Sequence, residues 1–387
     1  MKIGFFTDSY KPYISGVVKS IDSFTAQLEE QGHQVFIFAP DYPGAGYCEK
    51  VYRFKSLPAP TYPSFRLAIP FSNGLLQEVS RLNLDLIHTH SPFLMGWLGR
   101  YVARKMNIPL VFTYHTLYEE YVYYFPIVRD FARKLAIKYS KDYCQSCDLV
   151  ITPSQYVENK LRCYRVSTLL KTISTGVDLQ PYRNTESEWV REKYQLNPAE
   201  RLLLFVGRLG REKNIRFLLT AFKTVTESLN NVKLLLVGDG PDYQHLAEES
   251  ERMGLRDRVI FAGWQAHAQV IAYYLAADLF VFPSVTETQG LVTIEAMAGG
   301  LPVIAVDAAG SSDMVDDGVN GLLVKHDSQL FALSIIDLLT NDTRYKVLRK
   351  NALKKAEEYS IQNMTKRLLA AYQEACNYYY HREKILG

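Results

Sequence analysis

Short apolar runs alternate with helical patterns from end to end, and this alternation limits the fold more than any other feature of the sequence. Because parallel strands buried on both faces are continuous apolar runs joined by crossover helices, the pattern predicts parallel α/β sheets. In the first half, the predicted strands are Lys2–Thr7, Gln34–Ala39, Leu86–Thr89, Leu110–Tyr114 and Leu149–Thr152, and the predicted helices are Ser20–Gln31, Gly96–Met106 and Ile127–Cys144.

The alternation restarts after a polar stretch, Pro181–Glu200, which we interpret as a linker with one helical turn. The strands predicted there are Arg201–Val206, Val232–Val237, Val259–Ala262, Leu279–Phe282 and Val303–Val306, and the helices are Ile215–Ser228, Tyr243–Arg252, Gln269–Ala276, Leu291–Ala298 and Gln329–Leu339. A chain of 387 residues exceeds one ordinary core. We therefore expect an α/β fold of two doubly wound, Rossmann-like domains facing across a cleft, with ligands beyond the carboxyl ends of the strands.

Composition excludes several classes of protein. Apolar residues make up 48% of the chain and charged residues 22%, a balance that rules out a disordered or fibrous protein. A net charge of +3 is too small for nucleic-acid binding as a main function. No apolar run reaches the length of a membrane-spanning helix or of a signal-peptide core, so a cytoplasmic protein is expected. The 5 cysteines are too sparse for a disulfide framework.

The strongest motif is Glu287-Thr-Gln-Gly-Leu-Val-Thr-Ile-Glu295, which spans a turn and the start of a predicted helix. Gly290 lets backbone amides come close to a ligand, and the N-terminus of the helix favours phosphate. One carboxylate can accept hydrogen bonds from sugar hydroxyls and the other from a ribose. The alternative interpretation is a capped helix with two solvated acids.

Two further loops follow predicted strands. Val206-Gly-Arg208-Leu-Gly-Arg-Glu-Lys213-Asn214 places two cations where a diphosphate would bind, although it could also be a basic surface loop. Ile14-Ser-Gly16-Val-Val-Lys-Ser opens a helix and is weak evidence for a phosphate-approach loop. His88-Thr-His90 places two histidines on one strand face, for which we favour a lining role at the strand end over metal binding.

Together these residues resemble the GT4-type family of retaining glycosyltransferases, which have the GT-B fold. The Glu-x7-Glu motif is the most specific mark, and the resemblance covers essentially the whole chain. The family's usual Glu-Gly-Phe-Gly is Glu287-Thr-Gln-Gly290 here, a departure at the two residues between the first glutamate and the second glycine. That variant and the opening Asp8-Ser-Tyr-Lys-Pro-Tyr-Ile-Ser-Gly-Val resemble the branch that glucosylates diacylglycerol.

The resemblance implies a role for each matching residue. Arg208 and Lys213 would stabilise the diphosphate leaving group, Glu287 would bind the donor sugar and Glu295 the ribose. Gly16 would admit the diphosphate to the N-terminal loop, and His115 would lie beside the sugar. The implied catalytic residues are His115, Arg208, Lys213 and Glu287, and the implied donor-binding residues are Gly16, Arg208, Lys213, Gly263, Glu287, Gly290, Leu291 and Glu295.

The resemblance also implies a division of labour. Residues 1–177 would form an acceptor-binding domain, with a C-terminal helix over 361–387 packing back on it, and 178–360 a nucleotide-sugar-binding domain. Asp-x-Asp occurs nowhere in the sequence. We therefore expect a reaction without a metal ion or other cofactor, in which two cations and a helix N-terminus supply the positive charge.

A basic amphipathic segment, Ile127–Gln145, follows a cluster of aromatic residues in the sequence. Such a segment can lie on anionic lipid, or it can be an ordinary crossover helix with a solvated basic face. The residues assigned to membrane or acceptor contact are Tyr118, Tyr121, Arg129, Arg133, Lys134 and Lys138.

The sequence thus predicts a retaining, metal-independent transferase that moves a hexose, expected to be glucose, from a UDP-sugar to a membrane lipid, expected to be 1,2-diacylglycerol. It would act on the inner face of the cell membrane, with a nucleotide sugar and an anionic lipid surface as partners and no nucleic acid. The alternatives are a transferase with a soluble or polyprenyl-linked acceptor, a nucleotide-sugar epimerase, and a binding or scaffold protein without turnover. The sequence does not indicate the oligomeric state.

Overall fold

The computed structural model describes residues 1–60, 64–70, 74–120, 129–308, 310–311 and 313–386, with the side chains of residues 129, 385 and 386 outside this part. The backbone contacts divide the chain into two compact units. The first unit comprises Met1–Gly176 and Ile361–Gly387, and the second comprises Val177–Ser360. Val177, which we expected in the first domain, belongs to the second unit because its backbone pairs with Ser360.

The first unit is built on a parallel sheet in the spatial order β3-β2-β1-β6-β7-β8-β9. Its inner strands are almost entirely buried, which explains why they are continuous apolar runs in the sequence. The strands are β1 (Lys2–Phe6), β2 (Gln34–Pro40), β3 (Val51–Phe54), β6 (Leu86–Thr89), β7 (Leu110–Thr113), β8 (Leu149–Thr152) and β9 (Leu169–Thr172), and β4 (Ser56–Pro58) and β5 (Arg66–Ala68) form a separate antiparallel pair.

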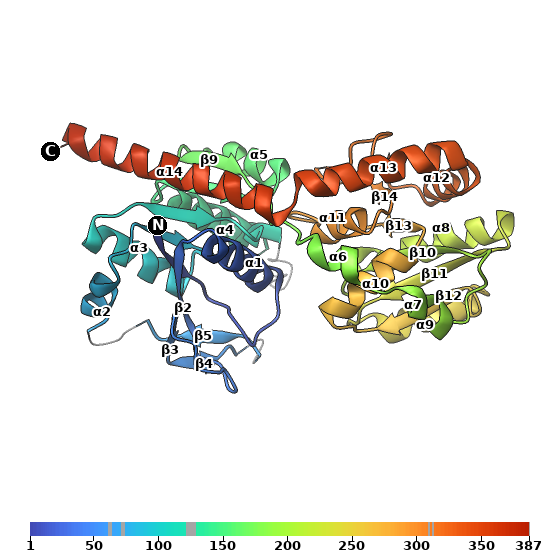
Figure 1. Ribbon diagram of the computed structural model, residues 1–387, viewed down its shortest axis with the longest axis horizontal. Coiled ribbons are helices and arrows are strands. Elements are labelled where there is room, and N and C mark those ends of the chain that lie inside the picture. The colour runs from blue at the N-terminus through green and yellow to red at the C-terminus, as the bar shows by residue number, and fades with distance from the viewer. Residues whose placement is uncertain (61–63, 71–73, 121–128, 309, 312, 387) are drawn as a thin grey trace. The chain divides into compact units, whose positions relative to one another are not determined.

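Helices cover both faces of this sheet. α1 lies on one face, where it packs against α14, and α3 and α4 lie on the other (Figure 1). Polar contacts fasten α14 to this unit: the Tyr372 hydroxyl lies 2.7 Å from Nδ1 of His88, and Arg382 pairs with Asp148 at 3.0 Å. The helices are α1 (Gly16–Glu30), α2 (Leu75–Leu82), α3 (Leu94–Met106), α4 (Arg129–Cys144), α5 (Gln155–Cys163) and α14 (Ile361–Leu386).

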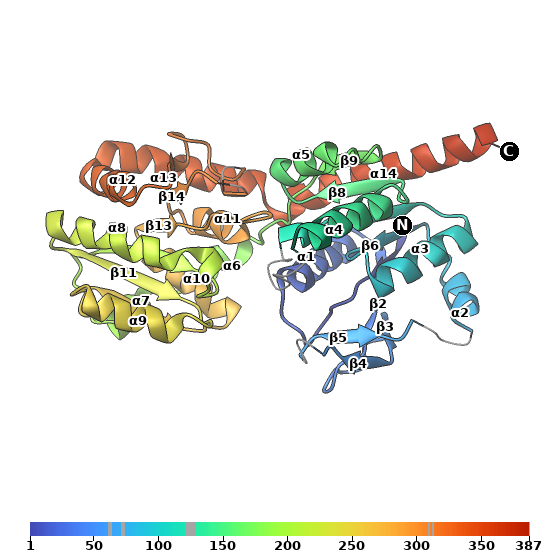
Figure 2. The same cartoon turned by 180° about the vertical axis from the view of Figure 1, so that it is seen from behind.

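The second unit repeats the plan with a parallel sheet in the order β12-β11-β10-β13-β14-β15. Helices α8 and α12 pack together, as do α11 and α13 (Figure 2). The strands are β10 (Arg201–Val206), β11 (Val232–Val237), β12 (Val259–Gly263), β13 (Leu279–Phe282), β14 (Val303–Val306) and β15 (Gly321–Val324). The helices are α6 (Gln180–Asn184), α7 (Glu188–Lys193), α8 (Ile215–Ser228), α9 (Tyr243–Arg252), α10 (His267–Ala276), α11 (Leu291–Ala298), α12 (Ser328–Thr340) and α13 (Asp342–Glu358).

The stretch that we interpreted as a linker is part of the second unit. It contains α6 and α7, both of which contact α10, and Val190 is fully buried in the core. The prediction failed because two short helices carry too few apolar positions to show a helical period. Strands β3, β9 and β15 and the β4–β5 pair were also missed.

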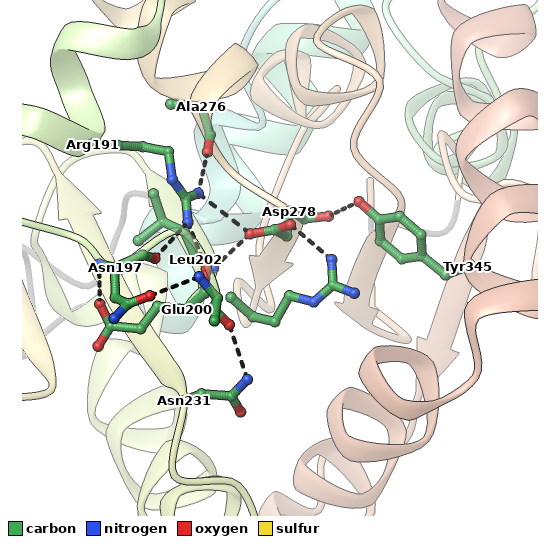
Figure 3. Close-up of polar contacts among 10 residues, drawn as sticks. Arg191, Asn197, Glu200, Leu202, Asn231, Ala276, Asp278 and Tyr345 are labelled. Carbon is green, nitrogen blue, oxygen red and sulfur yellow. Dashed lines mark hydrogen bonds and ion pairs between the residues drawn. The ribbon is translucent and has the colours of Figure 1, made fainter.

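Asp278 organises the amino-terminal edge of the second sheet (Figure 3). Its carboxylate accepts a hydrogen bond from the Leu202 amide at 2.8 Å and pairs with Arg201 at 3.1 Å, and its carbonyl accepts the Tyr345 hydroxyl at 2.8 Å. These contacts tie β10, β13 and α13 together at the edge opposite the candidate site.

Candidate active site

In the parallel sheet of each unit there is a point where two neighbouring strands are connected to their next strands on opposite sides. In the second unit this point lies between β10 and β13, because β10 is followed by β11 on one side and β13 by β14 on the other. Ligands of open α/β sheets bind at such points, beyond the carboxyl ends of the strands. Arg208 and Lys213 follow β10 and Glu287 follows β13, so the structure brings these predicted residues to one edge of the sheet.

Lys213 and Glu287 form an ion pair across the two loops. The Ser284 hydroxyl donates to Oε1 of Glu287 at 2.8 Å, the same oxygen that the Lys213 ammonium contacts. The side chains are only 19% and 14% exposed, which reduces screening by water. Arg208, in contrast, is exposed, and its guanidinium has no hydrogen-bond or ion-pair partner in the described part of the chain.

The start of α11 is shaped by two glycines. Gly290 caps the helix with φ of 67°, a left-handed conformation that favours glycine. Gly310 packs so closely that an added Cβ would lie 2.4 Å from the Glu287 carbonyl oxygen. Leu291 is the first residue of α11 and packs partly on the core, and Gly263 ends β12 at the same edge of the sheet. The N-terminal amides of α11 follow directly from this turn.

Glu295 is buried one turn into α11, where the Tyr274 hydroxyl of α10 donates to its Oε2 at 3.1 Å. Burial and the neighbouring carboxylate raise the pKa of Tyr274 well above its ordinary value, so the phenol stays a donor. The Tyr182 ring of α6 lies 6.5 Å from that of Tyr274. Sequence reasoning missed both tyrosines because nothing in the motif Glu-x7-Glu indicates which residues pack beneath it.

The first unit has its own such point, between β1 and β6. Asp8 follows β1 and is buried; it accepts hydrogen bonds from the Ser91 hydroxyl and, at 3.1 Å, from the Met95 amide of α3. Burial raises the pKa of its carboxyl, although these hydrogen bonds oppose the shift. Gly16 is the first residue of α1 and is exposed, and a Cβ there would meet open space. The chain itself therefore does not require glycine at this position.

His115 follows β7, and its Nε2 lies 3.0 Å from Nδ1 of His90, which follows β6. Burial lowers the pKa of His115 from its ordinary 6.5 to about 4, so the imidazole is neutral at physiological pH. His88 bonds through both ring nitrogens, to Thr113 and Tyr372, each at 2.7 Å. His88 and His90 are thus buried partners of other side chains.

Comparison with known proteins identifies the chain. Residues 14–181 match the family model described as "Glycosyltransferase Family 4" and residues 186–355 match "Glycosyl transferases group 1". The alpha-monoglucosyldiacylglycerol synthase of Streptococcus pneumoniae is 35% identical over 97% of this chain and 86% of its own length. The chain belongs to the family 4 glycosyltransferases.

Further relatives agree. The alpha-monoglucosyldiacylglycerol synthase of Acholeplasma laidlawii is 31% identical over 91% of this chain and 92% of its own. Among solved structures, Anabaena HepE with UDP and glucose has a TM-score of 0.75 and 21% identity, covering 97% of this chain and 100% of that one. A sucrose-phosphate synthase from Thermosynechococcus elongatus has a TM-score of 0.76 and 23% identity, covering 96% and 98%. The expected GT-B fold and glycosyltransferase family are thereby confirmed, while the roles of individual residues stay predictions.

The residues of this glycosyltransferase assigned to membrane contact are only partly within the described chain. Arg133, Lys134 and Lys138 lie on α4 and are exposed. Tyr118 is partly buried, with its ring 5.1 Å from that of the exposed Phe93. Tyr121 and the side chain of Arg129 lie outside the described residues.

The apolar residues at the start of α4 do not pack on the sheet. Phe131 is 71% exposed and Leu135 is 56% exposed. Farther along α4, Ser140, Tyr143 and Cys144 are buried, so the helix packs on the unit through its later turns.

The glycosyltransferase also exposes aromatic residues on α3, which sequence reasoning missed. α3 and α4 lie side by side (Figure 2), joined by a 2.7 Å hydrogen bond from the Trp97 indole to the Tyr139 hydroxyl. The aromatic–basic surface, as we name it, consists of the exposed residues Phe93, Leu94, Trp97, Tyr101, Arg104, Lys105, Phe131, Arg133, Lys134, Leu135 and Lys138. The spacing of 94, 97 and 101 on one helix face was the available signal.

Proposed function

We propose that this glycosyltransferase moves glucose from UDP-glucose to 1,2-diacylglycerol at a membrane surface, with retention at the anomeric carbon and without a metal ion. The aromatic–basic surface of the first unit is the observation that most supports a lipid acceptor. Two relatives that span most of the chain are named alpha-monoglucosyldiacylglycerol synthases, which supports glucose and an α-linked product.

The second unit would bind the nucleotide sugar. Lys213 and the exposed Arg208 would contact the diphosphate, and the N-terminal amides of α11 would donate to its oxygens. Glu295, held by Tyr274, would accept hydrogen bonds from the ribose hydroxyls, and Glu287 would accept hydrogen bonds from hydroxyls of the glucose. Anabaena HepE, which shares the fold, was crystallised with UDP and glucose, and this supports UDP as the nucleotide of the donor.

The reaction breaks the bond between the anomeric carbon and the diphosphate oxygen and forms a bond from that carbon to the acceptor hydroxyl oxygen. The hydroxyl proton passes to the departing diphosphate. Charge builds up on the diphosphate as oxocarbenium character develops on the sugar, so the two cations act where they stabilise the transition state more than the ground state. They would supply the charge that a divalent cation supplies in other transferases.

The acceptor would reach the first unit from a bilayer. Exposed tryptophan and tyrosine suit the interface between headgroups and acyl chains, and basic side chains are attracted to anionic lipid. The charges of the described α4 residues are mixed with Asp130 and Asp142, so the attraction is moderate. None of the described helices combines the length and the apolar character needed to cross a bilayer. We infer peripheral association with the cytoplasmic face of the membrane.

Labelled UDP-glucose, liposomes with and without diacylglycerol, and EDTA test this proposal. Label extracted into the organic phase only when diacylglycerol is present is the expected result. Label transferred only to water-soluble or polyprenyl acceptors would refute the lipid acceptor. Release of a free epimerised sugar nucleotide without acceptor would indicate an epimerase, and dependence on added divalent cation would refute metal independence.

Charge-neutralising variants test the membrane contact. Changing Arg133, Lys134 and Lys138 to glutamine removes about 3 kcal/mol of attraction at about 1 kcal/mol per residue, or about 10²-fold in affinity for anionic vesicles. A matched control changes three exposed lysines of α13 in the second unit, Lys346, Lys350 and Lys354, to glutamine. Loss of vesicle binding in the first variant alone supports the surface, and equal binding by both would refute it.

A further inference from the structure

His90 and His115 form a hydrogen bond between two neutral imidazoles. Burial lowers the pKa of both rings, and the described contacts of His115 give it no ring partner other than His90. One nitrogen of the pair must therefore carry the proton and the other must accept it. The proton's position decides whether His115 presents a donor or an acceptor at its remaining nitrogen, Nδ1.

The burial of His90 decides between the two arrangements. His90 is 2% exposed, and its Nε2 is buried without a hydrogen-bond partner among the described residues. If His115 donated, His90 would carry its proton on Nε2 and bury an orphan N–H group. If His90 donates from Nδ1, only a lone pair is left unpaired at Nε2, and buried orphan acceptors are tolerated better than buried orphan donors.

The surroundings of His90 hold its ring in place. The Phe5 ring packs against it edge-on at 4.8 Å, and the His88 ring lies 4.2 Å away. His88 cannot rotate to serve Nε2 of His90, because both of its own nitrogens are engaged by Thr113 and Tyr372. The backbone amide of His90 is fixed by the Phe6 carbonyl at 2.8 Å.

We infer that His90 is a positioning residue that donates from Nδ1 to Nε2 of His115, so that His115 presents Nδ1–H as a hydrogen-bond donor to a hydroxyl group of the bound sugar. This inference deepens the proposed function and rests on the place beside the sugar that the family resemblance implies for His115. It assigns His90 no contact with substrate.

The tautomer can be measured on the full-length protein without substrate. In ¹⁵N-histidine-labelled enzyme, with the His115→Gln spectrum used for assignment, His115 should show a protonated Nδ1 and an unprotonated Nε2. In His90→Leu, His115 should shift toward the Nε2–H form that free histidine prefers, whereas His90→Asn keeps an amide donor near the original Nδ1. A matched control is His245→Leu, since His245 is exposed on α9. A wild-type His115 protonated on Nε2, or one unaffected in His90→Leu, would overturn the inference.

Kinetics with UDP-glucose and diacylglycerol vesicles separate this inference from the proposed function. His90→Leu should lower kcat by about 10-fold or more, and His90→Asn should recover most of that loss, with thermal melting confirming that both variants fold. Full activity in His90→Leu with an inactive His115→Gln would overturn the positioning role. An active His115→Gln would refute the proposed role of His115, and the spectrum would still decide the tautomer.

Discussion

Removing Lys213 should affect ligand binding more than the loss of one contact, because Glu287 would remain. Lys213 pairs with a carboxylate that is 14% exposed and is also held by Ser284. In Lys213→Met, this carboxylate loses its cationic partner and would repel the diphosphate that we propose binds there. Two effects therefore add: a lost attraction and an uncovered repulsion.

Their sizes follow from the burial of the pair. A hydrogen bond to a charged group contributes about 1.5–3 kcal/mol. Like charges at an effective dielectric of about 20 repel by about 4 kcal/mol at 4 Å and by about 2 kcal/mol at 8 Å. We expect Lys213→Met to weaken UDP binding by about 300-fold to 10⁵-fold and to lower turnover by at least about 10²-fold. Adding Glu287→Gln removes the repulsion and should restore UDP affinity by about 10-fold or more.

Isothermal titration with UDP in EDTA measures all four members of this cycle. The matched control is Lys355→Met, which breaks a 2.8 Å ion pair with Asp316 in the same unit and should leave UDP affinity unchanged. UDP affinity within about threefold of wild type in Lys213→Met would refute the site. A double variant that binds more weakly than Lys213→Met would refute the repulsion.

Three further outcomes are expected. Tyr274→Phe should raise KM for UDP-glucose by about 10-fold with a smaller change in kcat, because Glu295, which we propose binds the ribose, loses the donor that orients it; an unchanged KM in steady-state assays would contradict this role. Asp278→Asn should lower the free energy of unfolding by about 2–4 kcal/mol in urea titrations, because two arginines and an amide converge on that carboxylate, and a loss below about 0.5 kcal/mol would argue against it. Between pH 6.5 and about 4, His115 is protonated in the unfolded chain but not in the folded one, because burial lowers its pKa to about 4. The free energy of unfolding should therefore decrease by up to about 1.4 kcal/mol per pH unit as the pH falls. His115→Gln should reduce that slope by the same amount relative to wild type.

The inner strands of both sheets could be predicted because a strand buried on both faces must be apolar throughout. β6, β8, β10, β11, β13 and β14 begin and end at the predicted residues, and most of their side chains are apolar. β9 (Leu-Leu-Lys-Thr) is an edge strand and only partly buried, so its sequence carries a mixed signal. α7 was missed because Val190 is buried by packing on neighbouring elements and not by any local pattern.

The candidate site was predictable to the extent that its residues follow strands directly. Lys213 and Glu287 are 74 positions apart, but each comes just after a strand, and neighbouring parallel strands carry their following loops to one edge. Tyr274 contacts Glu295 and His90 contacts His115 from other elements, and short-range sequence patterns do not report contacts of that kind.

The sequence by itself determined the class of fold, the loops that bear chemistry and the family, because buried strands and ligand-facing loops restrict residue type at each position. Only the tertiary structure decided which side chains meet. The Lys213–Glu287 pair, the Tyr274–Glu295 bond and the His90–His115 bond each depend on the order of strands and the packing of helices around them. The exposure of Trp97 and Phe131 was likewise decided by packing, since a helix can turn either face toward its sheet.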